Sequence, residues 1–293
     1  FQNLGGHDFK VLREAYLKAD RVDRPSVVFA YTMKGWRLPS MGDPQNHSVV
    51  MSEDAIEELR QQLNISREKP WATFDPKSDV GRFCIEVGEQ SRSYKNKGNS
   101  GADLTVPATL GHSYVGTMST QQAFGVILTD VARDIPKIAQ KIVTVSPDVA
   151  STTNLGGWIN KAGVWSREEK PELPGEEIIR SLKWDENPKG RHIELGISEN
   201  NLFMLLGQLG LSSEMFGELL FPIGAVYDQF VCRALDAFMF NMYSGSRFIT
   251  IGTPSGITLS PEGGAHQSTV TQGIGIEIPD LTFYEPCFAQ ELE

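Results

Sequence analysis

The sequence has few of the features that mark several large classes of protein. It contains three cysteines, Cys84, Cys232 and Cys287, which are far apart and lack the spacing of a metal site. Scattered thiols suit a reducing compartment better than a disulfide-stapled fold, so we expect a cytoplasmic protein. No apolar run reaches the ~18–20 residues that a membrane helix needs, which predicts no membrane partner.

Positive charge is also scarce. The formal net charge is -10 at pH 7, and no dense run of Lys or Arg occurs. A nucleic-acid partner held by general electrostatics is therefore not expected. The chain has no HExxH, GxSxG, P-loop or paired CxxC motif, which removes the enzyme classes that these motifs identify.

What remains is an ordinary globular composition, 40% hydrophobic and 22% charged, with strands and helices that alternate. Apolar periodicity predicts helices over 8–20, 52–63, 119–134, 198–211 and 227–243. Short apolar runs predict strands at 25–35, 141–149, 191–195, 217–223, 247–256 and 281–287. This alternation indicates an α/β fold, a parallel sheet with helices on both faces. Ligands of such sheets bind beyond the carboxyl ends of the strands.

The composition changes between residues 66 and 116, which are polar and show little periodicity. We interpret 66–116 as an interdomain linker between a first domain, 1–65, and a second, 117–293. A structureless stretch of this length is uncommon inside a compact domain, so points such as Trp71 and Phe74 are expected to pack on a neighbouring surface.

Glu199 is the first candidate for chemistry. It follows "GIS" at the start of an apolar helix that comes directly after an apolar strand. A first-turn acid that stabilises the helix dipole is the simpler interpretation. The alternative is a functional carboxylate, because a buried acid needs a cation or several hydrogen-bond donors around it. The pattern alone leaves both interpretations open.

Three other features are weaker. His266 lies in a Gly-rich loop after a buried strand, where glycines allow close approach to a ligand, although an incidental loop histidine is the alternative. Tyr227 and Phe230 share one face of the helix predicted at 227–243, which on periodicity alone indicates core packing. Cys232, in the same stretch, is expected to be a small core residue. His47 follows the strand predicted at 25–35, and an incidental loop histidine is the simpler account.

Taken together, two sets of segments resemble one family. "GGHDFKVLREAYLKA", "RPSVVFAYTMKGW" and "GDPQNHS" look like the last part of the diphosphate-binding domain of transketolase-like thiamine diphosphate enzymes. "MSTQQAFG", "VTVSPDVASTTNLGGW", "RHIELGISENNLF" and "GTPSGITLSPEGGAHQS" look like the pyrimidine-binding domain that follows. The sequence most resembles the homodimeric type of 2-oxo acid dehydrogenase, the decarboxylating component of the pyruvate dehydrogenase complex. The resemblance implies the thiamine diphosphate-binding fold, preceded by the tail of a second α/β domain.

The resemblance also implies roles for individual residues. Glu199 matches a glutamate that hydrogen-bonds the aminopyrimidine ring of thiamine diphosphate and so promotes loss of the thiazolium proton. His266 matches an active-site histidine that orients or protonates the substrate carbonyl. Tyr227 and Phe230 fall where the family places an aromatic clamp on the ring, with a spacing that can differ by one residue. Asp148 matches a position near the cofactor cleft.

The resemblance further implies what surrounds the site. His47 falls near a histidine that faces the diphosphate and the reaction centre. No GDG motif for the diphosphate and Mg²⁺ occurs, so the Mg²⁺ ligands are expected upstream and no metal ligand is assigned within the chain. We therefore expect a fragment of a longer polypeptide, truncated at the C-terminus of its pyrimidine domain and inactive alone. The expected partners are a second identical subunit, a lipoyl-bearing acyltransferase component and the 2-oxo acid substrate.

Two alternatives stay open at this level. One is a transketolase-type enzyme that moves two-carbon units between sugar phosphates; the few Arg and His residues of the pyrimidine segment favour a small 2-oxo acid instead. The other is a non-catalytic dimer scaffold, against which the presence of Glu199 and His266 argues.

Overall fold

The structure, a computed structural model, describes residues 4–95, 104–170, 182–258, 261 and 263–293. The chain divides into two compact units, Phe1–Ile85 and Glu86–Glu293, and the boundary falls inside helix α3 (Asp79–Lys95). This helix lies within the stretch predicted to lack periodic structure, so that expectation was wrong for its described part. The domain limits at 65 and 117 stay a prediction, and the part of the linker from 96 to 103 lies outside the described residues.

The first unit contains the two helices expected from periodicity, α1 (Phe9–Ala19) and α2 (Glu53–Gln62). Their N-caps are Asp8 and Ser52, whose side chains accept backbone N–H groups of the first turn. The strand predicted at 25–35 is wrong, because the described residues of this unit form no ladder. Several of its apolar side chains are exposed, 80% in the case of Phe29. Trp71 and Phe74 are also exposed, at 93% and 63%, so their expected packing on a neighbouring surface stays a prediction.

The second unit contains a six-stranded sheet in which every paired neighbour is parallel, as predicted. The strands lie in the order β3-β2-β4-β1-β5-β6. Their bounds are β1 (Ile142–Ser146), β2 (Val164–Trp165), β3 (Glu186–Asn187), β4 (His192–Glu194), β5 (Phe221–Val226) and β6 (Ile249–Gly252). The pattern did not indicate the two-residue strands β2 and β3. The strand predicted at 281–287 is wrong, since the chain has no regular structure there.

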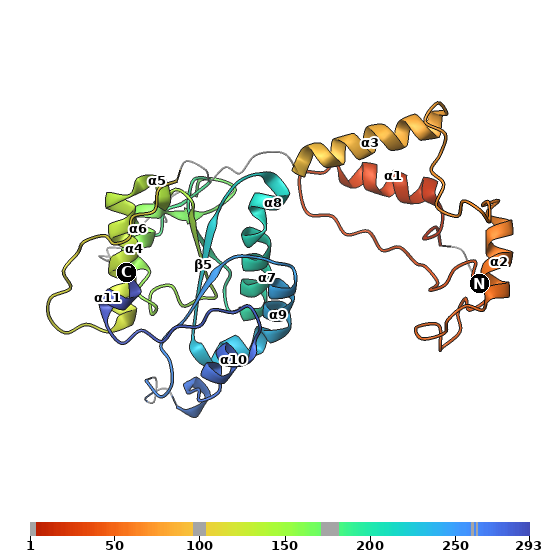
Figure 1. Ribbon diagram of the computed structural model, residues 1–293. Coiled ribbons are helices and arrows are strands. Elements are labelled where there is room, and N and C mark those ends of the chain that lie inside the picture. Colours follow the sequence, from red (N-terminus) through yellow and green to blue (C-terminus); the bar gives the residue numbers. More distant parts are fainter. Residues whose placement is uncertain (1–3, 96–103, 171–181, 259–260, 262) are drawn as a thin grey trace. The chain divides into compact units, whose positions relative to one another are not determined.

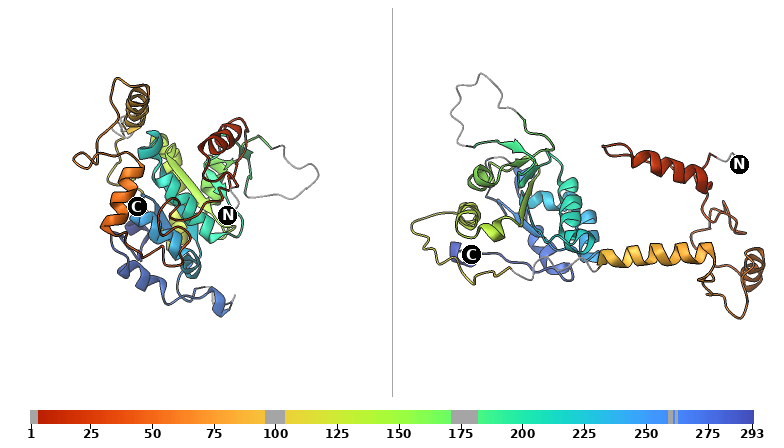
Figure 2. Two further views of the ribbon diagram at one scale, coloured as in Figure 1. Left: turned by 90° about the vertical axis from the view of Figure 1, so that its right-hand side faces the viewer. Right: turned by 90° about the horizontal axis from the view of Figure 1, so that it is seen from above.

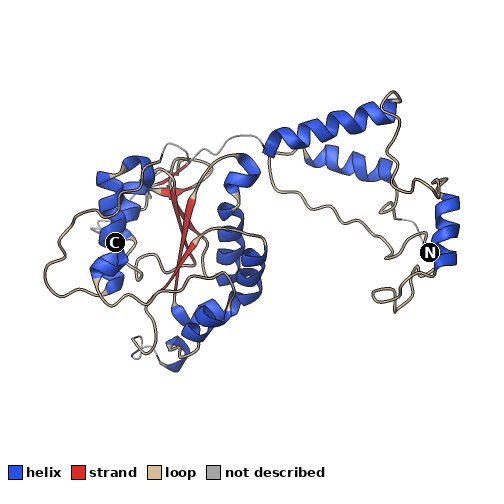
Figure 3. Cartoon of the chain, viewed as in Figure 1, coloured by secondary structure: helices blue, strands red, loops and turns tan. Residues whose placement is uncertain are grey.

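Helices cover both faces of this sheet (Figures 1 and 3). One face carries α4 (Thr120–Asp134), α5 (Pro136–Ala139), α6 (Gly156–Ala162) and α11 (Ala289–Leu292). The other carries α7 (Glu199–Gly210), the 3₁₀ segment η1 (Asp228–Ala234) and α9 (Leu235–Tyr243), with α8 (Ser212–Phe216) following α7. Figure 2 shows the same arrangement from above, with the green helices on one side of the strands and the teal helices on the other. The described residues of this unit also include two short helices, η3 (Gly264–His266) and α10 (Thr271–Glu277).

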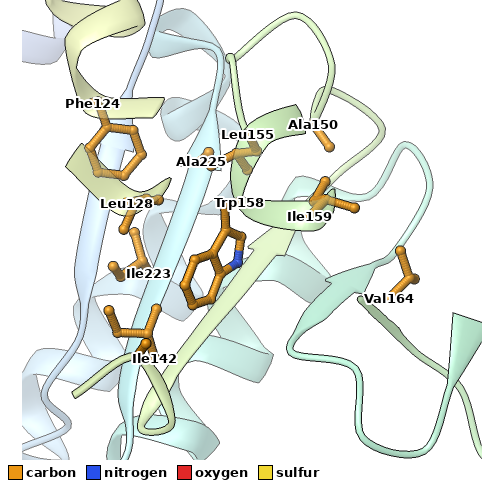
Figure 4. Close-up of a cluster of buried hydrophobic side chains, with 11 residues drawn as sticks. Phe124, Leu128, Ile142, Ala150, Leu155, Trp158, Ile159, Val164, Ile223 and Ala225 are labelled. Carbon is orange, nitrogen blue, oxygen red and sulfur yellow. The ribbon is translucent and has the colours of Figure 1, made fainter. Parts of the chain in front are cut away.

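Each face has its own apolar core. Figure 4 shows the cluster beneath α4 and α6, in which Trp158 and Leu155 are almost fully buried. Leu202, Phe203 and Leu206 of α7 form the centre of the other cluster. The stretch predicted as one helix from 227 begins instead as the 3₁₀ segment η1, and this geometry leaves Cys232 exposed. The expectation that Cys232 belongs to the core was therefore wrong. Among the described helices, none is long and apolar enough to cross a membrane.

Candidate functional site

The sheet topology places a switch point at the carboxyl end of β1, where a ligand-binding crevice is expected. The chain leaves β1 towards α6 on one face, whereas it leaves the flanking strands β4 and β5 towards α7 and η1 on the other. Such switch points, where loops diverge to opposite faces, are the usual ligand sites of parallel sheets. Four adjacent strands, β4, β1, β5 and β6, deliver the candidate residues to this end of the sheet.

Glu199 is the first residue of α7, and only 8% of its surface is exposed. Its carboxylate accepts a hydrogen bond from Nη1 of Arg233 at 3.0 Å. The guanidinium carbon of Arg233 lies 3.8 Å from the centroid of the Phe230 ring. A mostly buried acid thus has a cation partner that reaches it from η1, and sequence reasoning did not identify that partner.

Three further predicted residues meet beside this pair. Tyr227, at the end of β5, and Phe230 have ring centroids 6.1 Å apart with planes inclined by 30°. The imidazole of His266 lies edge-on to both rings, 6.2 Å from Tyr227 and 5.4 Å from Phe230. The Tyr227 hydroxyl donates to Oγ1 of Thr152 at 2.8 Å, which ties the β5 exit to the loop after β1. The fold therefore brings the predicted aromatic pair together with the predicted histidine.

Asp148 sits in the loop after β1 with a left-handed φ of 68° and is exposed. Its backbone N–H donates to Oε1 of Glu194 at 2.6 Å, and the same oxygen accepts from Leu195 and Gly196. Glu194, missed by sequence reasoning, thus fixes the loop exits of β1 and β4 against each other. Its place at the end of an apolar strand, in "RHIEL", was the signal that could have identified it.

A series of polar contacts connects Glu194 to the interior of the sheet. Oε2 of Glu194 lies 3.5 Å from Nε2 of His192, a fully buried residue. The other ring nitrogen of His192 is 2.9 Å from Oγ1 of Thr144, which also accepts the indole N–H of Trp158 at 2.9 Å. Each of these polar groups has a partner, as buried polar groups require.

Asp228 anchors the loop that carries His266. It is 3% exposed, and its Oδ2 accepts the backbone N–H of Gly256 at 3.2 Å. Gly256 in turn accepts the backbone N–H of Ser268 at 3.0 Å. This buried carboxylate, also missed from the sequence, joins the start of η1 to both ends of the His266 loop.

His47 belongs to the first unit, where its Nδ1 lies 2.7 Å from Nζ of Lys34. The structure describes it only within that unit. Its predicted contribution to the site therefore stays a prediction.

A second charged cluster joins acids of α4 to His112, which precedes that helix in the chain. The ring of His112 contacts two carboxylates, Asp130 at 2.9 Å and Asp134 at 3.1 Å. Arg133 pairs with both acids, at 2.8 Å each, and its hydrogen bond lowers the pKa of Asp134. Among the described residues, His112, Asp130 and Asp134 are the group whose ligand atoms lie close enough to hold a metal. Arg133 already occupies an oxygen of each acid, so we assign no metal here.

The site residues fit one end of thiamine diphosphate. Glu199 offers a carboxylate to the edge of a planar nitrogen heterocycle, while Tyr227 and Phe230 offer aromatic faces and His266 offers a ring nitrogen. This set does not fit a metal ion, because Glu199 brings no second acidic ligand with it among the described residues. The arrangement is suited to holding an aromatic ring and to moving a proton beside it.

A family described as "Pyruvate dehydrogenase E1 component middle domain" matches residues 100–293, more than half of the chain. The chain belongs to this middle-domain family. The middle domain and the residues before it are similar to the E1 components of Mycobacterium tuberculosis, 25% identical over 98% of this chain, and Escherichia coli, 23% identical over 99%. The chain spans about one third of these relatives, 33% and 35% of their lengths.

Solved structures agree with the fold. Transketolase from Leishmania mexicana superposes with a TM-score of 0.65 at 18% identity, covering 94% of this chain and 40% of that one. Transketolase from Campylobacter jejuni superposes with a TM-score of 0.61 at 15% identity. At these identities the similarity shows the fold alone.

Proposed function

We propose that the chain supplies the pyrimidine half of the active site of a thiamine diphosphate-dependent 2-oxo acid dehydrogenase that acts on pyruvate or a related 2-oxo acid. One observation carries the proposal: Glu199, Phe230 and His266 meet at the carboxyl end of the sheet in a chain of the E1 family. When bound, thiamine diphosphate supplies the carbon nucleophile and the electron sink for decarboxylation.

Each residue has a task that its position supports. Glu199 hydrogen-bonds the edge of the aminopyrimidine, Phe230 stacks on its face, and Tyr227 supports Phe230 within the aromatic clamp. His266, edge-on to both rings, holds a proton near the substrate carbonyl. Asp148 borders the crevice from the β1 side, in a loop that Glu194 fixes.

The rest of the reaction belongs to groups outside this set. We propose that Mg²⁺ and the diphosphate are held by other residues of the full-length protein, with His47 facing the diphosphate. The active protein is a cytoplasmic homodimer. It passes the acyl group to a lipoyl-bearing acyltransferase.

The deciding experiment is Glu199→Gln in the full-length gene product. Loss of the carboxylate should slow proton exchange at the thiazolium carbon by about 10²–10⁴-fold, the usual contribution of a positioned acid or base. Glu214→Gln, an exposed acid on α8, is the matched control and should leave the exchange unchanged. Far-UV circular dichroism should be the same for both variants.

Near-wild-type exchange in Glu199→Gln, with both variants folded, refutes the proposed role. Assays with pyruvate and with sugar phosphates in parallel separate this proposal from a transketolase, because only the dehydrogenase releases CO₂.

A further inference from the structure

Arg233 contacts both of the groups that are proposed to hold the aminopyrimidine. Its guanidinium donates to Glu199 at 3.0 Å and lies over the Phe230 ring at 3.8 Å from the centroid. A guanidinium is planar and cationic, carries N–H donors at its edge and stacks on aromatic faces. It therefore satisfies the same carboxylate and the same ring that a planar heterocycle would use.

The two occupants exclude each other on geometric grounds. A ring that stacks on Phe230 while hydrogen-bonding Glu199 must lie on the side of Phe230 that is nearest to the carboxylate. The guanidinium of Arg233 lies on that side, because it contacts both groups at once. One of them has to leave before the other can bind.

Arg233 is able to leave. The side chain of Arg233 is 54% exposed, whereas that of Glu199 is 9% exposed, so the cation can move into solvent and the acid is largely enclosed. Asp236, three residues further along and exposed, is a neighbouring acceptor for the displaced guanidinium. The carboxylate is held in place and the arginine is the movable partner.

We propose that Arg233 is a self-inhibitory latch: it fills the aminopyrimidine position and is displaced when the cofactor binds. The inference rests on the proposed function and adds a regulatory step to the same site. The latch keeps a buried carboxylate paired until the ring arrives. It also raises the cofactor concentration that the protein needs, because binding must first break the Arg233–Glu199 pair.

The test is isothermal titration calorimetry of the full-length gene product with Mg²⁺ and two ligands, thiamine diphosphate and 4-amino-5-hydroxymethyl-2-methylpyrimidine. The second ligand is uncharged and reports on the ring position alone. Arg233→Met keeps a long side chain at this position and removes its charge. Arg247→Met makes the same change on an exposed arginine before β6, outside the crevice, and is the matched control.

The latch predicts a lower Kd for both ligands in Arg233→Met, by about threefold to thirtyfold, the strength of an ion pair plus a cation–π contact. Arg247→Met should match the wild type. Added NaCl should tighten binding of the uncharged pyrimidine to the wild type but not to Arg233→Met, because salt screens the competing pair. An unchanged or higher Kd in Arg233→Met overturns the latch, as does no binding of the pyrimidine to that variant.

A double variant keeps the two proposals separate. Arg233→Met and Arg233→Met/Glu199→Gln both lack the latch, so their difference measures only the carboxylate's contact with the ring. If the double variant binds as tightly as Arg233→Met, the proposed function of Glu199 fails. If it binds more weakly while Arg233→Met equals the wild type, only the latch fails.

Discussion

The backbone N–H of Asp148 donates to the carboxylate of Glu194 at 2.6 Å, and this bond joins the exits of two adjacent strands, β1 and β4. The same carboxylate oxygen accepts two further backbone N–H groups. The side chain of Glu194 thus connects the loop after β1 to the loop after β4.

Glu194→Ala should lower the free energy of unfolding by about 1–3 kcal/mol, because N–H groups that a carboxylate satisfied lose their acceptor. Urea denaturation measures this. The control is Glu218→Ala, which removes an exposed pair with Lys141 and should cost at most about 1 kcal/mol. Equal losses in the two variants would contradict the anchoring role of Glu194.

Thr144→Val should cost about 1–3 kcal/mol of stability, although the two side chains have nearly the same shape. The hydroxyl accepts from Trp158 and bonds His192, and valine leaves both buried groups without this partner. Thermal unfolding measures the loss against Thr258→Val, an exposed site. A loss confined to experimental error would show that these buried groups find other partners.

Asp228→Ala and Asp228→Asn should differ. Asparagine keeps an oxygen that can accept the Gly256 N–H, whereas alanine removes it. Amide hydrogen exchange at Gly256 should therefore accelerate strongly in Asp228→Ala and only slightly in Asp228→Asn. Similar exchange in wild type and Asp228→Ala would mean that the His266 loop does not depend on this carboxylate.

Two glycine substitutions should have opposite effects. A Cβ at Gly224 of β5 would lie 2.5 Å from Cδ1 of Leu206, so Gly224→Ala overpacks the contact with α7 and should cost about 1–3 kcal/mol. A Cβ at Gly273 in α10 meets nothing within 4 Å, so Gly273→Ala should stabilise by about 0.5–1 kcal/mol through helix propensity. Differential scanning calorimetry of both variants tests the pair.

Alkaline stability should depend on Tyr114. Burial, with the nearby negative charges of Glu293 and Asp130, raises the pKa of Tyr114 from 10.0 to about 12. The neutral phenol contributes its full stabilisation below pH 10, and this is lost as the pH rises from 10 towards about 12. Tyr114→Phe should remove that part of the pH dependence. Ultraviolet absorbance of the phenolate and urea denaturation at each pH follow the two effects, and identical pH profiles for wild type and variant would contradict the assignment.

The sequence predicted the longer strands at the centre of the sheet but missed β2 and β3, which have only two residues each. The apolar runs at β1 and β4 became strands because each has a parallel partner, whereas the similar run at 25–35 has no ladder among the described residues. Periodicity identified α7 correctly but could not tell a 3₁₀ segment from an α-helix after Tyr227, because the two repeats nearly coincide over one turn.

The residues of the candidate site were also predicted only in part. The pattern and the family resemblance proposed Glu199, Tyr227, Phe230 and His266 as site residues, and the fold brings these four near one another. The sequence did not predict Arg233 and Asp228, because each acts through a distant contact. Arg233 bonds a residue 34 positions away, and Asp228 bonds one 28 positions away. Spacing within one helix or strand carries no information on contacts at that range.

The parallel sheet also has a consequence for how the chain folds. β1 at its centre pairs with β4 on one side and β5 on the other, and Thr144 meets His192 from 48 residues away. Closing loops of that length costs chain entropy before any strand contact compensates for it. We expect α4 and α7 to gain helical structure early and the centre of the sheet, together with the crevice above it, to form last.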